Sequence, residues 1–173
     1  MRIPIPFRRI VIVTVAILCM IATVSANATV VRLNKGQEIQ VKFAGDTKVS
    51  SGELVKGDSI DIVLAEAIII DDSTIVEAGA EGKAVVLDAK KNGRAGKPGY
   101  IKVAFTNLQP KGAFKTDGGP ILLSGELENE GKGKKTLSYL FIFGLFIKGS
   151  NGELDSGSVY TATIAESIKL RSE

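Results

Sequence analysis

Short runs of alternating apolar and polar residues, separated by glycine-rich turns, occupy most of this chain from Gly36 onward. Residues 38–43, EIQVKF, place three apolar side chains on one face and three polar ones on the other. Ser59–Leu64, Tyr100–Leu108 and Ser158–Ile164 repeat this period of two. Such alternation is typical of strands buried on one face. The sequence therefore predicts an all-β fold, a single β-barrel or sandwich of about nine to eleven short strands.

Other segments add strands and connections to this prediction. Ile68–Ile70 and Thr74–Val76 flank a polar Asp-Asp-Ser turn, which indicates a tight hairpin. Lys83–Asp88 holds four consecutive apolar residues, as in a strand covered on both faces. Ile121–Glu128 is expected to be one further strand, and Ile168–Leu170 the last. The polar, glycine-rich segments 44–57, 109–120 and 149–157 are expected to be loops.

One stretch of the chain repeats at an offset of 100 residues. Gly57–Ile70 aligns without gaps on Gly157–Leu170, with a glycine, an Ala-Glu pair and an isoleucine identical. Each copy reads as a glycine turn, a half-buried strand, a polar break and a shorter strand. Gly36 and Gly79 open similar strands. The repeat predicts pseudo-symmetry in the barrel or sandwich.

The N-terminal 28 residues have the three parts of a secretory signal peptide. Arg2, Arg8 and Arg9 precede an apolar run at 10–24, and small residues at 26 and 28 follow it. We expect cleavage after Ala28 and a single extracytoplasmic β-domain over residues 29–173. The run is shorter than the roughly 20 residues that a spanning helix needs. Leu18 stands before Cys19 where a lipoprotein signal has a small residue.

Removing this segment also removes the basic surplus of the chain. The 22 basic residues fall to 19, equal to the 19 acidic residues, so the mature domain has no formal net charge. We therefore expect no nucleic-acid partner, because nucleic-acid binding needs a surplus of Lys and Arg on one face. The mature domain also lacks Cys, His and Trp. We expect no cofactor and no metal site of the thiolate or imidazole kind.

Leu137–Ile147, LSYLFIFGLFI, is the most apolar stretch outside the signal peptide. Read as a strand or as a helix it is apolar on both faces, so it is expected to be a strand or a short helical insert. Three roles remain open: part of the domain core, a surface for a protein partner or for self-association, or an outer-membrane contact. Lysines on both sides suit anionic head groups. The candidate interaction surface is Leu140, Phe141, Phe143, Phe146, Lys134, Lys135 and Lys148.

A second candidate lies in the loop 90–99, KKNGRAGKPG, which is basic and rich in glycine. Its backbone N–H groups, with Arg94 and Lys97, are candidates for contacting an anion. The alternative is an ordinary hairpin connection. No helix is expected to follow, because an alternating strand begins at Tyr100.

No catalytic motif stands out in this sequence, and we expect the protein not to be an enzyme. Without His or Cys, the usual nucleophile–base pairs are missing. Gly131–Thr136 lacks the spacing of a phosphate-binding loop. The carboxylate pairs Asp58–Asp61 and Asp71–Asp72 leave a hydrolase of envelope polysaccharide as the alternative.

The order of the turns and strands resembles the periplasmic β-barrel domain of TrbI-like conjugation and type IV secretion scaffold proteins. The matching motifs are Gly36-x-x-Ile39-x-Val41-x-Phe43, Ser50-Ser51-Gly52, Ala65-Glu66-Ala67-Ile68, Ala78-Gly79 with Gly82, Gly118-Gly119-Pro120-Ile121, and Gly131 with Gly133. In that family an apolar segment late in the barrel projects to the outer membrane, and Leu137–Ile147 has a similar place. The proline-rich linker of the family is missing here. The resemblance implies a periplasmic or outer-membrane-associated domain with a structural or assembly role.

Overall fold

The computed structural model describes residues 28–45, 49–94, 96–132 and 150–172. Within these residues the chain forms fourteen β-strands and no helix, which confirms the predicted all-β fold. The strands are β1 (Val30–Leu33), β2 (Glu38–Phe43), β3 (Val49–Ser50), β4 (Ser59–Leu64), β5 (Ile68–Ile70), β6 (Ser73–Val76), β7 (Glu81–Lys90), β8 (Tyr100–Leu108), β9 (Phe114–Thr116), β10 (Ile121–Ser124), β11 (Glu126–Glu130), β12 (Glu153–Leu154), β13 (Tyr160–Ile164) and β14 (Ile168–Ser172).

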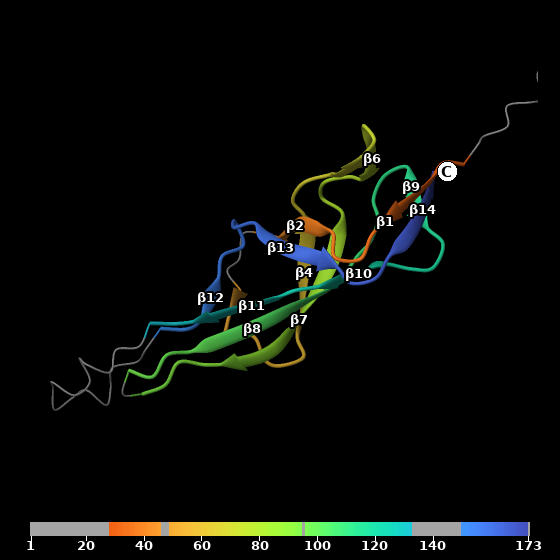
Figure 1. Ribbon diagram of the computed structural model, residues 1–173. Coiled ribbons are helices and arrows are strands. Elements are labelled where there is room, and N and C mark those ends of the chain that lie inside the picture. The colour runs from red at the N-terminus through yellow and green to blue at the C-terminus, as the bar shows by residue number, and fades with distance from the viewer. Residues whose placement is uncertain (1–27, 46–48, 95, 133–149, 173) are drawn as a thin grey trace, which may run out of the picture.

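Six of these strands close into a barrel (Figure 1). Their order is β10-β13-β2-β4-β7-β8, and β8 pairs back onto β10 through Leu108 and Ile121. Closure satisfies the backbone groups that an open sheet would expose at its edges. The inward positions are those that the alternation predicts: Ile39, Val41, Phe43, Ile62, Leu64, Ile101, Val103 and Phe105 are all at most 4% exposed.

The strand expected over Ile121–Glu128 is broken in two at Gly125. This glycine has φ 135°, which favours a residue without a side chain, and its carbonyl accepts the Phe105 N–H at 3.0 Å. Before the break, β10 pairs with β13 and β8. After it, β11 pairs with β8 alone, from Glu126 opposite Ala104 to Glu130 opposite Tyr100. The break therefore lets one run of chain close the barrel and then leave it.

The internal repeat of the sequence is also a structural repeat. Its two strands, β4 and β13, lie on either side of β2. At the end of β4, Leu64 accepts the N–H of Gly79 at 2.8 Å, and at the end of β13, Ile164 accepts the N–H of Gly36 at 2.8 Å. Both glycines have positive φ, 76° and 82°. The longer strand of each copy thus ends in a buried aliphatic residue whose carbonyl is bonded to a glycine in a left-handed turn.

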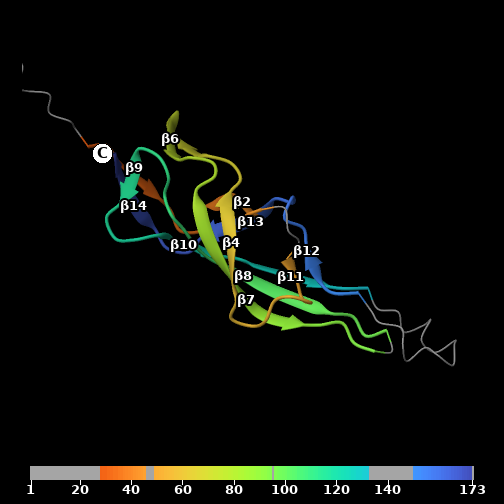
Figure 2. The same ribbon diagram turned by 180° about the vertical axis from the view of Figure 1, so that it is seen from behind.

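A three-stranded sheet, β1-β14-β9, covers one end of the barrel. Its inner face contributes Leu33 and Leu170, each 0% exposed, and Phe114 at 8%. The β7–β8 ribbon extends from the opposite end of the barrel, with β11 and β12 beside it (Figures 1 and 2). The C-terminal strand and the far end of this ribbon are therefore at opposite ends of the molecule.

The predicted hairpin at 68–76 is confirmed. β5 and β6 pair antiparallel, and the turn residues Asp71 and Asp72 have φ of 47° and 59°. Two successive positive φ angles define a type I′ turn, whose twist matches that of the flanking strands. The two aspartates are thus turn residues of an exposed hairpin.

Three of the predicted loops contain short strands that hydrophobic alternation does not reveal. β3 lies in the segment 44–57, β9 in 109–120 and β12 in 149–157. They are two or three residues long and pair with distant partners, which explains why the number of strands exceeds the prediction. The prediction that both faces of 83–88 are covered is wrong: Ala84 and Val86 are buried, whereas Val85 and Leu87 are only half-buried.

Two predicted elements lie outside the described residues. They are the signal peptide, of which only Ala28 is described, and the apolar stretch Leu137–Ile147.

Candidate functional site at the tip of the ribbon

The basic loop 90–99 lies at the far end of the β7–β8 ribbon, next to the two chain ends that flank residues 133–149. We call this end of the ribbon the tip and define it as residues 91–94, 96–99, 131–132 and 150–151. Arg94 and Lys97 lie in the tip, and both are exposed. The candidate residues of the apolar stretch lie between its two chain ends and outside the described residues: Leu140, Phe141, Phe143, Phe146, Lys134, Lys135 and Lys148.

The chain leaves for residues 133–149 and returns from them at a single point. The Ser150 N–H donates to the Lys132 carbonyl at 3.1 Å, and the Lys132 N–H donates to the Ser150 Oγ at 2.6 Å. These two bonds link Lys132 and Ser150 in the way that paired residues of adjacent strands are linked. The ends of the apolar segment are therefore fixed side by side.

The basic loop is held against this junction. Gly99 accepts the N–H of Gly131 at 2.8 Å and donates its own N–H to the Ser150 carbonyl at 2.8 Å. Further along the loop, the Asn92 N–H donates to Asn151 Oδ1 at 3.2 Å. The basic loop 90–99 and the two chain ends at 131–132 and 150–151 thus meet in one place.

Glycines make this close approach of the chains possible. A Cβ on Gly131 would lie 2.1 Å from the Ser150 carbonyl oxygen, and one on Gly99 would lie 2.9 Å from the Lys90 carbonyl oxygen. A Cβ on Gly152 would lie 2.4 Å from the Asn129 carbonyl oxygen. No side chain fits at these distances, because at each glycine a backbone carbonyl oxygen lies within 3.0 Å of the added Cβ. Sequence reasoning missed this role, since glycines at loop ends are usually explained by turns.

The two segments that contribute residues to the tip are rich in positive charge. Residues 90–99 and 131–150 hold eight of the 19 basic residues after Ala28 and none of the 19 acidic ones. The described members are all exposed: Lys90, Lys91, Arg94, Lys97 and Lys132. The rest of the mature domain is correspondingly acidic. The balanced composition thus conceals a local concentration of basic residues in these two segments.

The backbone of the basic loop is largely used in the loop itself. The Gly93 N–H donates to the Lys97 carbonyl at 3.0 Å, and the Lys97 N–H donates to Arg94 at 3.4 Å. With Asn92 and Gly99 also bonded, these four N–H groups are directed at protein acceptors. Any anion held by this loop would therefore be bound chiefly by its side chains.

Behind the tip, β8 and β11 carry a row of paired side chains. Lys102 Nζ lies 2.6 Å from Glu126 Oε2, and the Tyr100 hydroxyl donates to Glu128 Oε2 at 3.3 Å. The hydrogen bond to Glu126 raises the pKa of Lys102. Burial of the ring and the nearby Glu128 raise the pKa of Tyr100. These pairs join the strand that leaves the barrel to its neighbour.

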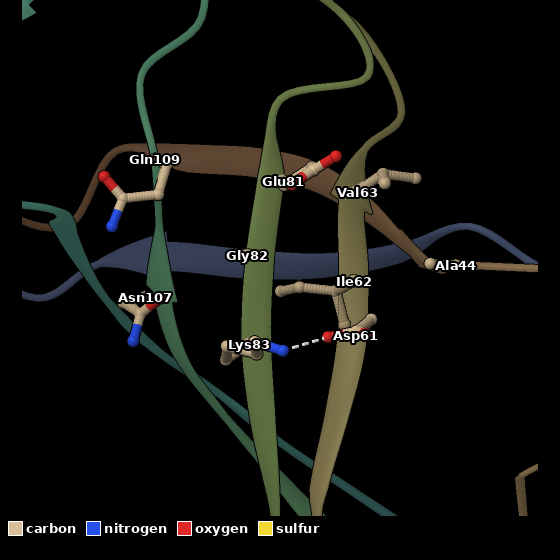
Figure 3. A pocket seen from close by; sticks show the side chains of 9 residues that line it. All are labelled: Ala44, Asp61, Ile62, Val63, Glu81, Gly82, Lys83, Asn107 and Gln109. Carbon is tan, nitrogen blue, oxygen red and sulfur yellow. Dashed lines mark hydrogen bonds and ion pairs between the residues drawn. The ribbon is translucent and has the colours of Figure 1, made fainter.

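A groove of about 340 Å³ lies over β4, β7 and β8, away from the tip (Figure 3). Gly82 lies at its centre, flanked by Asn107 on one side and Ile62 on the other. Its only ion pair joins Lys83 to Asp61. The groove thus offers two amides, the Glu81 carboxylate and one neutralised charge pair.

The carboxylate pairs that raised the hydrolase alternative have structural partners. Asp58 Oδ2 accepts the Val55 N–H at 2.8 Å and closes a turn. Asp61 pairs with Lys83 on the neighbouring strand. Asp71 and Asp72 form the β5–β6 turn. Each aspartate is placed by local backbone or by a cross-strand pair.

Comparison with protein-family models, with curated protein sequences and with solved structures found no match to this chain. None of the described residues belongs to a helix that is long and apolar enough to cross a membrane. Among the residues that the structure describes, no three acidic, His or Cys side chains are grouped so that they could hold a metal ion.

Proposed function

We propose that this chain is an exported, non-enzymatic β-domain of the bacterial cell envelope with a structural or assembly role. It binds through the tip, using the apolar stretch Leu137–Ile147, to a protein partner, to itself or to the outer-membrane surface. The observation that carries this proposal is the junction of Lys132 and Ser150 against Gly99. This junction brings Lys132 and Ser150, which flank the segment that contains the apolar stretch, next to the basic loop.

The closure of the barrel supports a binding role for the apolar stretch. Each of the six barrel strands is already paired on both sides, so the barrel has no open edge for another strand. An apolar stretch that the barrel does not bury would form an exposed patch, and such patches mark protein or membrane contacts. Burying each large apolar side chain of the stretch stabilises a complex by about 1.5–3 kcal/mol.

The position of the tip also supports the proposal. It lies at the opposite end of the molecule from β1 and β14 (Figure 2). A domain that enters the envelope by its N-terminus would present the tip away from its point of entry. The resemblance to TrbI-like scaffold domains favours the same arrangement, with an outer-membrane contact and a periplasmic or outer-membrane-associated location.

Fractionation of the protein from cells tests this function. We expect the wild-type protein to stay with the envelope through a high-salt wash and to be released by detergent, since apolar contacts resist salt. A Phe141→Glu/Phe143→Glu variant should be released into the soluble periplasmic fraction. Release of the wild-type protein without detergent would overturn the proposal.

A matched control separates loss of the contact from a general effect of added charge. Ile69 is 61% exposed on β5, which pairs with β6 in a hairpin that lies away from the tip in Figure 1. Ile69→Glu should leave the envelope association unchanged. Equal release of the Ile69 and Phe141/Phe143 variants would contradict a role specific to the tip.

A further inference from the structure

The outer face of the three-stranded sheet carries four cations in two like-charged pairs. Arg32 on β1 is directly opposite Lys169 on β14, and Arg171 on β14 is directly opposite Lys115 on β9. In antiparallel strands, directly opposite residues share one face of the sheet, and so do residues two apart on one strand. All four side chains are therefore on one face, and all four are exposed. We call this the cationic face.

Few acidic side chains of the described residues pair with these cations. Arg171 Nη2 lies 3.0 Å from Asp117 Oδ2, but within the described part of the chain no ion pair involves Arg32, Lys115 or Lys169. Like charges directly opposite each other destabilise a sheet. The inner face of the same strands is fixed by buried Leu33 and Leu170, so the cations cannot turn inward.

Exposed aliphatic side chains accompany the charges. Val30 is 53% exposed on the cationic face, opposite Arg171, and Leu122 is 42% exposed in an adjoining groove of about 480 Å³. Arg32 and Lys169 line one part of this groove, and two acids, Asp117 and Glu166, lie in it as well. Cations around exposed aliphatic groups are typical of surfaces that rest on a bilayer.

The sequence before β1 favours a bilayer over an acidic protein as the occupant. The apolar run at 10–24 is separated from Val30 by only five residues. Six residue steps reach at most about 20 Å when fully extended. Before the expected cleavage after Ala28, that run holds β1 close to the head groups of the membrane that it enters.

We propose that the cationic face binds the anionic head groups of a lipid bilayer, and that Arg32, Lys115, Lys169 and Arg171 supply the attraction. This contact is separate from the tip and lies at the opposite end of the molecule (Figure 1). It is electrostatic, so it weakens as salt is added. A domain with both contacts would connect two surfaces of the envelope.

Flotation of the purified protein with vesicles tests this proposal. We expect binding to vesicles of phosphatidylcholine with phosphatidylglycerol at low salt, and its loss at high salt or with phosphatidylcholine alone. Each cation near an anionic surface strengthens binding roughly fivefold, so Arg32→Gln/Lys169→Gln should weaken it by about 25-fold. Lys42→Gln/Lys56→Gln, which removes two exposed cations elsewhere, should leave binding close to wild type.

The same measurement on the Phe141→Glu/Phe143→Glu variant separates the two contacts. Salt-sensitive binding should persist in that variant and should fall when Arg32→Gln/Lys169→Gln is added to it, because the cationic face supplies the attraction. The proposal is overturned if the wild-type protein binds anionic and neutral vesicles equally. It is also overturned if Arg32→Gln/Lys169→Gln and Lys42→Gln/Lys56→Gln lose vesicle binding equally. Binding to an acidic polypeptide without binding to vesicles would overturn it in favour of a protein partner.

Discussion

Arg32 and Lys169 are directly opposite each other on the antiparallel strands β1 and β14, and both are exposed. Stability alone does not explain this pair, because like charges directly opposite each other destabilise a sheet. The two cations repel each other across the narrow distance between paired strands. The apolar residues next to them, Leu33 and Leu170, hold the strands together from the other face.

Reversing one charge of this pair should make the domain more stable. Lys169→Glu places a carboxylate opposite Arg32 and replaces repulsion with attraction, so we expect a gain of about 0.2–1 kcal/mol at low salt. Urea unfolding at low and high salt measures it. The gain should shrink in salt, because exposed charges are screened. A loss of stability would mean that Lys169 makes favourable contacts in the fold.

The glycine junction of the tip should not tolerate a side chain. Gly131→Ala puts a Cβ 2.1 Å from the Ser150 carbonyl oxygen, so one of the two chains must move. We expect the free energy of unfolding to fall by about 1–3 kcal/mol. Gly118→Ala is the control, because a Cβ there meets nothing within 4 Å. Similar losses of unfolding free energy in the two variants would show that the close approach at Gly131 is not the cause.

Alternation in the sequence predicts the barrel well because inward and outward positions must differ along each strand. Ile39, Val41 and Phe43 on β2 show this, and so does the hairpin around Asp71 and Asp72. The same logic fails for β3, β9 and β12, which are too short to show a period. Their pairing depends on partners more than 50 residues away along the chain.

The tip was predictable only in part. The basic loop and the apolar stretch each stand out by composition, but nothing in the sequence shows that Gly99 and Ser150 are hydrogen-bonded. The cationic face was invisible for the same reason. Arg32, Lys115 and Lys169 are far apart in sequence, and only the registers of β1 and β9 on β14 bring them together.

The β5–β6 turn should gain stability from residues that favour positive φ. Asp71→Asn/Asp72→Gly installs the Asn-Gly pair that type I′ turns prefer. Relief of the strained backbone at φ 47° and 59° should stabilise the domain by about 0.5–1 kcal/mol. Thermal unfolding checks it. The variant also removes both carboxylates of the hairpin, so any loss of an envelope function would show that they do more than form a turn.

The environment of Tyr160 should make the domain lose stability in alkali. Burial raises the pKa of its hydroxyl above the usual 10.0, while its hydrogen bond to the Asp155 carbonyl, at 2.9 Å, fixes its orientation. The folded state therefore keeps this proton at a pH where the unfolded chain has released it. The stabilising effect is complete below about pH 10 and is lost as the pH rises through the higher pKa of the folded state.

Tyr160→Phe provides the test, since it keeps the ring that packs edge-on against Phe43 with centroids 5.4 Å apart. Unfolding is measured in urea from neutral pH to about pH 11. The wild-type protein should lose more stability than the variant over the alkaline part of this range. Parallel pH profiles would show that Tyr160 titrates alike in the folded and unfolded states, and the decline would then belong to other groups, with Tyr100 and Lys102 the first to examine.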